Sequence, residues 1–166
     1  MTTESPRTLT ADLCDAYESA YVIPGRFYPY GGSDICLGPA EVIATEDDNS
    51  LVATTLREPG RGRILFVDNS GSMHCAMVGG DLARAAHDND WQGIVVHGAI
   101  RDTVELREAP IAIYARGTCP RKSIKRGIGT IGKPADLGGI AVHRDDIVAA
   151  DADGVVLIPG ADFKGL

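Results

Sequence analysis

Short apolar runs alternate along the chain with stretches of helical spacing. Two of these runs, RILFVD and WQGIVVHGA, have the length and β-branched content of buried strands. Between them, the segment MVGGDLARAAHDND joins two glycines to a helical pattern, which predicts a turn that leads into a helix. Strand, turn, helix and strand between Arg63 and Ala99 make a βαβ-like unit of the usual size. We therefore predict an α/β core.

The flanking patterns predict further helices and strands. The first predicted helix has Thr10 as its N-cap, and a Gly-, Pro- and Tyr-rich irregular stretch follows it. No repeat or linker divides the chain, so residues 1–166 are expected to form one domain. The expected elements are helices over 10–17, from about 48 to 59 and over 101–109, strands over 35–45 and 111–117, and short strands separated by acidic turns over 137–159.

The charge balance narrows the classes of function. The 166 residues carry 16 Lys and Arg against 23 Asp and Glu, a net charge of -7, which argues against general binding to nucleic acid or to an anionic membrane. No apolar run approaches the roughly 20 residues of a membrane span, and the first residues lack the apolar core of a signal peptide. Four cysteines without a CxxC motif are expected to be reduced and mostly buried. We expect a cytoplasmic protein.

The glycine turn is the first candidate site. The amides at the beginning of a helix have no partner within the helix, and they favour an anion. Gly79 and Gly80 would let a carboxylate or a phosphate approach the backbone closely, where the helix dipole favours negative charge. The neighbouring residues form neither a Walker loop nor a dinucleotide fingerprint. The alternative is a turn with no role beyond the fold.

The end of the second strand is the other candidate site. Strand ends carry the binding sites of α/β proteins, and here Arg101 and Asp102 follow the strand directly. An arginine offers a planar fork to a carboxylate or carbonyl oxygen, and an aspartate binds hard divalent cations. The alternative is a surface ion pair in which Asp102 caps the next helix.

Other chemistries find less support. Schiff-base catalysis needs a desolvated lysine, but the four lysines lie in polar or terminal stretches. His74 and Cys75 are adjacent, so on a strand or turn their side chains point apart. The acidic residues near the C-terminus are explained by β-turns more readily than by a cation site, namely Asp145, Asp146, Asp151 and Asp153.

Residues 116–133, called the basic segment below, contain six of the sixteen basic residues and no acidic one. Such segregation is typical of a face that meets RNA, phosphate or an acidic partner. The basic segment has no aromatic residues for stacking on bases, so a solvated loop or a contact between subunits is the favoured interpretation. Direct binding of nucleic acid is not expected.

The two candidate sites together form a spaced pattern. Gly80, twenty residues, Arg101-Asp102, two residues and Glu105 match the G-x20-R-D-x2-[ED] motif of the RraA-like family, which the chain resembles from about Leu9 to Pro159. Supporting segments are VGGDLA, VVHGAIRD, GTCPRKS and DDIVAADADGVVLIP. The resemblance implies a β/β/α swivelling-type fold that assembles as a ring-shaped trimer. The sequence leaves open whether two such trimers stack into a hexamer.

The resemblance also implies a catalytic site. Arg101 and Asp102 would be catalytic, Gly79, Gly80, Asp81, Leu82 and Arg101 would bind substrate, and Asp102 would hold Mg²⁺ or Mn²⁺. Glu105 would contact the metal through a water molecule. The implied activity is metal-dependent cleavage of 4-hydroxy-4-methyl-2-oxoglutarate and similar 2-oxo diacids to pyruvate, with decarboxylation of oxaloacetate alongside it.

A different class of function stays open within the same family. Some members are regulators that bind and inhibit an endoribonuclease of the RNase E type, and an acidic body suits the masking of basic RNA-binding segments. A third activity attached to such sequences, demethylmenaquinone methyltransferase, lacks a recognisable S-adenosylmethionine motif here.

Overall fold

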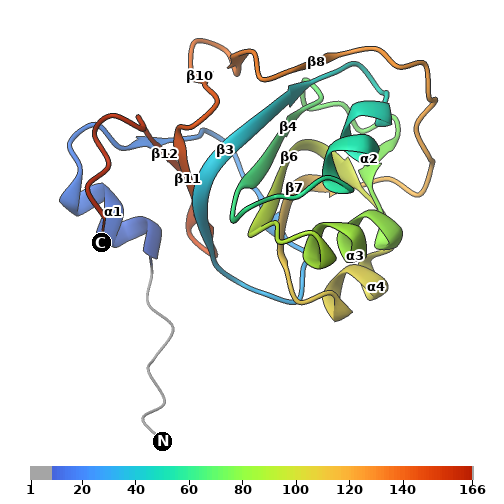
Figure 1. Cartoon of the computed structure of the whole chain (residues 1–166), viewed down its shortest axis with the longest axis horizontal. Helices are drawn as coiled ribbons and strands as arrows, with labels where there is room; N and C mark the ends of the chain where they lie inside the picture. The colour runs from blue at the N-terminus through green and yellow to red at the C-terminus, as the bar shows by residue number, and fades with distance from the viewer. Residues whose placement is uncertain (1–8, 166) are drawn as a thin grey trace, which may run out of the picture.

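The computed structural model describes residues 9–165 (Figure 1). Its centre is a group of four parallel strands in the order β3, β4, β6 and β7. Antiparallel strands extend the sheet on both sides, with β11, β12 and β1 beyond β3 and with β2 beyond β7. The short strand β5 runs parallel to β6 at its far end, β8 pairs with β3, and β9 and β10 form a separate two-stranded sheet. The predicted α/β class is confirmed, because parallel strands joined by helices form the core.

The strands differ widely in length. The central ones are long and buried, whereas several flanking ones are two residues long. The strands are β1 (Tyr21–Val22), β2 (Tyr28–Pro29), β3 (Cys36–Ala44), β4 (Ile64–Asp68), β5 (Ala76–Val78), β6 (Gly93–Ile100), β7 (Ala112–Thr118), β8 (Thr130–Ile131), β9 (Ala135–Asp136), β10 (Ala141–Val142), β11 (Ile147–Asp151) and β12 (Gly154–Ile158).

Of the four helices in residues 9–165, three cover one face of the sheet, and the fourth lies apart from them beside β11 and β12 (Figure 1). Within residues 9–165, no helix is long and apolar enough to cross a membrane. The helices are α1 (Leu9–Ala16), α2 (Ser50–Leu56), α3 (Gly80–Asp88) and α4 (Thr103–Glu108), of which α2, α3 and α4 cover the sheet.

Side chains of the central strands alternate between two cores. In β4, Leu65 and Val67 pack toward the helices, while Ile64 and Phe66 pack on the opposite face against β11, β12 and the β9–β10 hairpin. A strand buried on both faces is apolar throughout, which is why RILFVD lacks the polar alternation of a surface strand. Helices cover one face of the sheet and further strands cover the other.

The structure corrects the predicted elements in a few places. The strand that enters the glycine turn is β5, which the sequence pattern assigned to the turn itself, so the path from β4 to α3 contains one more strand than predicted. The stretch after α1, predicted to be irregular, contains the two-residue strands β1 and β2. Thr10 lies inside α1, and its hydroxyl donates to Asp151 Oδ1 at 2.7 Å rather than capping the helix.

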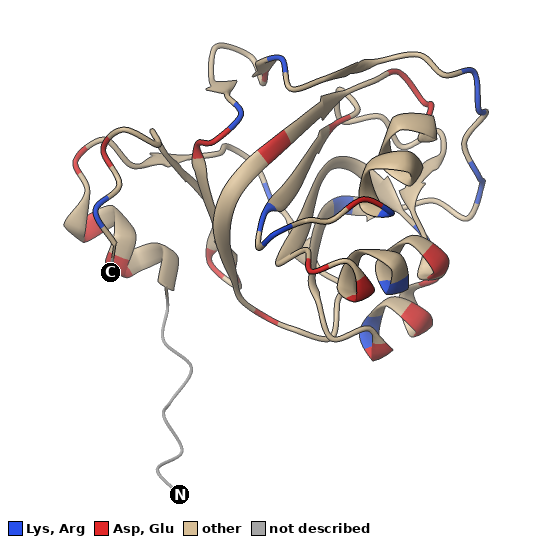
Figure 2. Cartoon of the chain, in the orientation of Figure 1, with Lys and Arg blue, Asp and Glu red and all other residues tan. Residues whose placement is uncertain are grey.

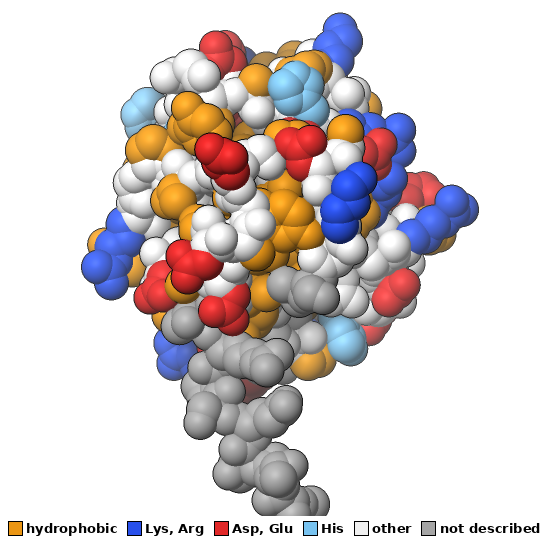
Figure 3. Space-filling model, turned by 90° about the vertical axis from the view of Figure 1, so that its left-hand side faces the viewer, with side chains coloured by type: hydrophobic (Ala, Val, Ile, Leu, Met, Phe, Trp, Pro, Cys, Tyr) orange, Lys and Arg blue, Asp and Glu red, His pale blue; other side chains and the backbone are white. Residues whose placement is uncertain are grey.

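Charged side chains are unevenly distributed over the surface. Lys and Arg positions, coloured blue, follow the basic segment at the right of Figure 2, and acidic positions, coloured red, occur along α3 and α4. The acidic residues of these two helices are exposed. The opposite end of the molecule, seen in Figure 3, exposes hydrophobic side chains between scattered acidic ones. Tyr21 and Val22 of the edge strand β1 are among the exposed hydrophobic residues. The positive charge therefore gathers on the side that carries the basic segment.

Candidate functional site

Two strand ends bring the glycine turn and the Arg101-Asp102 pair together. The strands β5 and β6 are parallel neighbours, and the amide of Arg101 donates to the carbonyl of Val78 at 3.0 Å. The register of β6 shifts between Val96 and Ala99 relative to β7, as at a β-bulge. Bulges redirect the chain next to binding sites. The two segments that the motif links across twenty residues are thus adjacent in space.

Asp102 connects the two helices of the site. It precedes α4 in the N-cap position, yet its side chain does not cap that helix. Its Oδ2 instead accepts a hydrogen bond of 2.9 Å from the amide of Gly80, the first residue of α3. The backbone of Asp102 is left-handed, with φ 61° and ψ 45°, a strained conformation that aspartate tolerates better than most residues. Asp102 therefore accepts from the start of a helix as the capping interpretation predicted, but this helix is α3 and not α4.

The two glycines are required because carboxylates occupy the space that their side chains would fill. A Cβ on Gly79 would lie 2.6 Å from Asp102 Oδ2, and a Cβ on Gly80 would lie 2.0 Å from Glu105 Oε2. Glu105 Oε2 also accepts from Arg84 at 3.1 Å. The amide of Gly80 is used by Asp102, so the helix-start amides of Asp81 and Leu82 are the ones left for a ligand.

The turn and the pair border a pocket of about 290 Å³. Every residue predicted to be catalytic or to bind substrate contributes to its lining, whereas Glu105 lines a neighbouring hollow between α3 and α4. The lining residues are Asn49, Arg57, Ala76, Gly79, Gly80, Asp81, Leu82, Arg101, Asp102, Lys122, Ser123 and Lys125.

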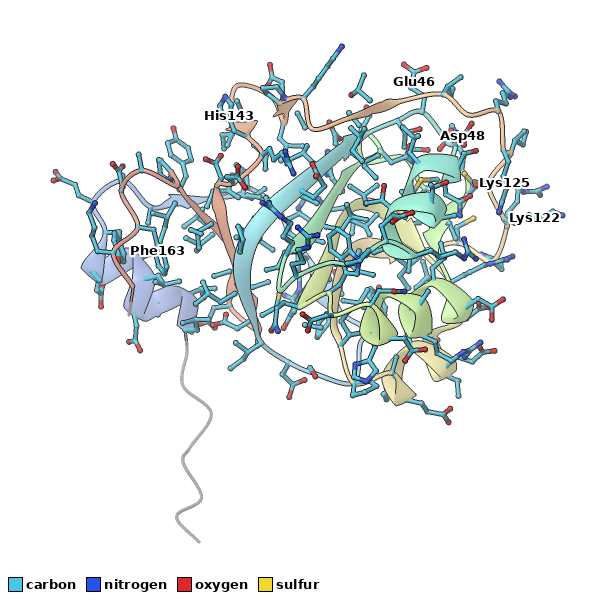
Figure 4. All side chains as sticks on the ribbon, viewed as in Figure 1. Glu46, Asp48, Lys122, Lys125, His143 and Phe163 are labelled. Carbon is cyan, nitrogen blue, oxygen red and sulfur yellow. The ribbon has the colours of Figure 1, made fainter. Side chains whose placement is uncertain are left out.

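The basic segment completes the pocket because buried polar groups fix it there. The hydroxyl of Ser123 donates to Asn49 Oδ1 at 2.6 Å, and the amide of Asn49 donates back to that hydroxyl at 3.1 Å. Asp48 Oδ2 accepts from the amides of Arg126 at 2.6 Å and Ile128 at 3.3 Å. Figure 4 shows Asp48 beside α2, with Lys122 and Lys125 on the adjoining basic segment.

Burial alone would raise the pKa of Asp48, which is only 1% exposed. Hydrogen bonds from Ser50, Arg126 and Ile128 outweigh burial and lower that pKa to about 2. Asp48 is therefore an anionic anchor for the basic segment at neutral pH.

Sequence reasoning did not predict the polar pocket residues outside the motif, namely Asn49, Arg57, Lys122, Ser123 and Lys125, although Lys122 and Ser123 belong to the segment GTCPRKS that supports the family resemblance. The acid-free composition of the basic segment was the available signal, but composition does not show which surface a loop lies against. Four cations and two carboxylates line the pocket, and one of these carboxylates, Asp81, is paired with Arg84 at 2.5 Å. The pocket is therefore locally cationic in an acidic chain, a charge pattern suited to a small anion.

The surroundings of the cysteine and histidine side chains show whether they could act as nucleophiles or bases. Burial, followed by the nearby Asp47 carboxylate, raises the pKa of the Cys75 thiol to about 11, which disfavours a nucleophilic thiolate. Burial and the neighbouring Arg116 lower the pKa of His97, whose Nδ1 accepts from Arg116 Nε at 3.0 Å. All four cysteines are free, but Cys14 is exposed and Cys119 is half-buried, so only two of them are buried as expected.

The acidic residues near the C-terminus make the local bonds that β-turns need. Asp146 Oδ2 accepts from the amide of His143 at 2.8 Å, and Asp151 Oδ1 accepts from the amide of Asp153 at 2.9 Å. Asp145 instead pairs with Arg63, which is distant in the chain, at 2.7 Å. The local bonds of Asp146 and Asp151 favour the turn interpretation for these two residues over a cation site.

Asp102 is the pocket residue best suited to hold a metal ion. Its side chain is 39% exposed, and within residues 9–165 its Oδ1 has no hydrogen-bond donor. No group of three His, Cys, Asp or Glu side chains suited to a metal occurs in that part of the chain. Mg²⁺ commonly binds through one or two carboxylates, water and substrate oxygens, and a single aspartate beside an open pocket fits that pattern.

The fold and this pocket define a mixed α/β protein in which the start of a helix borders a cationic pocket next to an Arg-Asp pair. The sequence profile of one family, described as RraA-like (Aldolase/RraA), matches residues 10–157. The chain belongs to the RraA-like family.

Relatives in this family carry different names. A Burkholderia mallei (strain SAVP1) protein named "Putative 4-hydroxy-4-methyl-2-oxoglutarate aldolase" is 44% identical over 154 residues, which span 89% of this chain and 93% of that protein. The solved structure of the RNA-processing inhibitor RraA from Thermus thermophilis has a TM-score of 0.88 at 41% identity and covers 94% of both chains.

Another solved structure bears a third name. A protein from Geobacillus kaustophilus HTA426, named as an S-adenosylmethionine: 2-dimethylmenaquinone methyltransferase, has a TM-score of 0.86 at 38% identity, with 90% of this chain and 94% of that chain covered. The family resemblance inferred from the motif is confirmed, and the names within the family extend over enzymes and an inhibitor.

Proposed function

We propose that the protein is a divalent-metal-dependent lyase that cleaves 4-hydroxy-4-methyl-2-oxoglutarate and similar 2-oxo diacids to pyruvate, and that it also decarboxylates oxaloacetate. The observation that carries this proposal is the pocket where Arg101, Asp102 and the start of α3 meet. The aldolase name of the Burkholderia mallei relative supports it.

In this proposal the chain holds the pyruvate half of the substrate. The amides of Asp81 and Leu82 bind the 1-carboxylate, and the guanidinium of Arg101 provides a fork for the carboxylate and keto oxygens. Breaking the bond between C3 and C4 leaves negative charge on the pyruvate half, and the proposed role of Arg101 is to stabilise that charge. These residues then act on the same part of every substrate.

Asp102 is the proposed metal ligand, through the oxygen that Gly80 does not occupy. When bound, Mg²⁺ or Mn²⁺ supplies a Lewis acid for the 2-oxo acid group. Glu105 uses one oxygen to accept from Arg84, so its other oxygen is the candidate acceptor for a water molecule on the metal. Because one carboxylate is the proposed protein anchor, we expect EDTA to remove the metal readily.

The test is pyruvate release from 4-hydroxy-4-methyl-2-oxoglutarate and from oxaloacetate, measured with Mg²⁺, with Mn²⁺ and after EDTA. Coupling to lactate dehydrogenase reports pyruvate through NADH oxidation. We expect metal-dependent release from both substrates. Pyruvate formation at the rate of the protein-free control would refute the lyase proposal.

A regulator of an endoribonuclease is the second candidate function. The similar Thermus thermophilis protein is named an RNA-processing inhibitor, and the net charge of -7 suits a basic partner. Inhibition of RNase E in a cleavage assay at stoichiometric protein, without metal-dependent pyruvate release, would favour this function over the lyase.

We also propose that the chain assembles as a homotrimer or as a hexamer of two rings. Exposed hydrophobic residues of the basic segment, Ile124, Ile128 and Ile131, lie next to its exposed cations and are suited to a contact between subunits. Light scattering coupled to size-exclusion chromatography measures the mass directly, and a monodisperse monomer would contradict the ring.

A further inference from the structure

We propose that Arg57, together with Lys122 and Lys125, forms a second carboxylate subsite that selects diacids over monoacids. This inference rests on the proposed lyase function and extends it from the pyruvate half of the substrate to the far half. It assigns a role to three pocket residues that lie outside the Gly-Arg-Asp motif.

The three cations reach the pocket from two separate parts of the chain. Arg57 follows the last turn of α2, and its Nη1 donates to the carbonyl of Ala53 at 3.0 Å, which holds the side chain along the helix. Lys122 and Lys125 come from the basic segment, on either side of Ser123. The hydrogen bonds between Ser123 and Asn49 attach this part of the basic segment to the start of α2. The cations are therefore placed by tertiary contacts.

The three cations also lack partners of opposite charge. Among residues 9–165, no carboxylate lies within 4.0 Å of the charged nitrogens of Arg57, Lys122 or Lys125. The chain has more acidic than basic residues, so partners are plentiful elsewhere on its surface. Like charges around one hollow repel each other, and a bound anion relieves that repulsion.

A diacid supplies the charge that this arrangement lacks. In the proposed function, the start of α3, Arg101 and Asp102 already bind the 1-carboxylate and keto group of the substrate. The remaining carboxylate of a 4-hydroxy-2-oxo diacid carries a full negative charge, which the far half of a monoacid lacks. Arg57 offers that carboxylate a two-nitrogen fork, and the two lysines add positive charge.

A matched pair of substrates isolates this subsite. The diacid 4-hydroxy-4-methyl-2-oxoglutarate and the monoacid 4-hydroxy-4-methyl-2-oxopentanoate differ only by a methyl group in place of the far carboxylate. Both react by the same balanced step, in which the C3–C4 bond breaks, the 4-hydroxyl loses its proton, C4 becomes a carbonyl carbon and C3 gains a proton. The products are two pyruvates from the diacid, and pyruvate with acetone from the monoacid.

The experiment compares Arg57→Gln with the wild type on both substrates, with Arg107→Gln as the control. Arg107 is an exposed arginine of α4 that does not line the pocket. We expect Arg57→Gln to lower kcat/KM for the diacid about tenfold, mainly through KM, and to leave the monoacid within about twofold, as for loss of one charged hydrogen bond. Lys122→Gln/Lys125→Gln should shift the same ratio, and circular dichroism should show an intact fold.

The outcomes separate this inference from the function on which it rests. A fall in the diacid-to-monoacid ratio of kcat/KM supports the subsite. An unchanged ratio in Arg57→Gln, with wild-type cleavage of both substrates, overturns the subsite and leaves the lyase intact. An equal loss on both substrates also overturns it, because Arg57 would then act on the shared half. If the wild type cleaves neither substrate, the proposed function itself fails.

Discussion

Asp48 and Asp102 each follow a buried strand and precede a helix, yet the structure uses them differently. Asp48 is buried, and its two oxygens accept from the amides of Ser50, Arg126 and Ile128. Asp102 is partly exposed and accepts one hydrogen bond, from Gly80, within the described residues. A buried carboxylate that accepts hydrogen bonds on both oxygens holds a structure together, whereas one with a free oxygen at a pocket is available to a ligand.

This difference teaches how one residue type separates into structural and chemical roles. Asp48 connects the start of α2 to the basic segment and so places Lys122 and Lys125, without itself lining their pocket. Asp102 accepts a hydrogen bond from the start of α3 through one oxygen, and its other oxygen is available at the pocket. The following predictions test whether stability and turnover divide between the two aspartates in this way.

The largest effect is expected from Asp102→Asn. An amide is a much poorer ligand for a hard cation than a carboxylate, so metal-dependent pyruvate release should fall about a thousandfold, while the amide oxygen can still accept from Gly80. The measurement is the coupled pyruvate assay together with thermal unfolding. Near-wild-type turnover would show that Asp102 does not anchor the metal.

Arg101→Lys should have the next largest effect. An ammonium group keeps the charge but not the planar fork, so kcat/KM should fall about a hundredfold. Arg101→Gln removes the positive charge that Arg101→Lys keeps, so Arg101→Gln should lower kcat/KM further. The steady-state kinetics of both variants on oxaloacetate check this order, and equal kcat/KM in Arg101→Lys and wild type would place Arg101 outside the site.

Gly79→Ala tests the packing of Asp102 directly. Gly79 has an extended backbone with φ -130°, which alanine adopts without strain, but its Cβ would lie 2.6 Å from Asp102 Oδ2. The displaced carboxylate should lower turnover about tenfold to a hundredfold, since small displacements of catalytic groups are costly. Gly117→Ala is the control for glycine loss outside the pocket lining, because Gly117 has no positive φ and its Cβ would make only ordinary contacts with the Met73 side chain, at 3.4 Å or more. Unfolding and pyruvate release should be measured for both, and equal losses would remove the link to Asp102.

The smallest effect on turnover is expected from Asp48→Asn, which acts on stability. The folded pKa of Asp48, about 2, lies below its ordinary value of 3.8, so ionised Asp48 stabilises the fold above about pH 4 and this contribution disappears as the pH falls toward 2. A shift of this size corresponds to about 2 kcal/mol. At pH 7, the free energy of unfolding of the wild type should therefore be higher than that of Asp48→Asn by about 2 kcal/mol.

Urea unfolding from pH 7 to pH 2 measures this stability difference, which should narrow below pH 4. Asp162→Asn, an exposed carboxylate in the C-terminal turn, serves as the control and should match the wild type throughout. A gap between wild type and Asp48→Asn that stays constant down to pH 2 would contradict the role of the ionised carboxylate.

Much of the fold follows from local sequence. Apolar runs of strand length predicted β3, β4, β6 and β7, and helical spacing predicted α1, α2, α3 and α4, because burial of one or both faces leaves a periodic trace in the chain. The spacing between Gly80 and Arg101-Asp102 also identified the core of the pocket. These residues lie at the ends of neighbouring strands, so a local motif sufficed to bring them together.

The rest of the pocket depended on the tertiary structure. Nothing in the pattern around Arg57 or Lys122 indicates that α2 and the basic segment face the same hollow, because their approach depends on the hydrogen bonds of Asp48, Asn49 and Ser123. The sequence by itself determined the class of fold, the family and the Gly-Arg-Asp motif. The tertiary structure decided which helix Asp102 caps and which cations join it, since contacts between residues far apart in the chain leave no periodic signal.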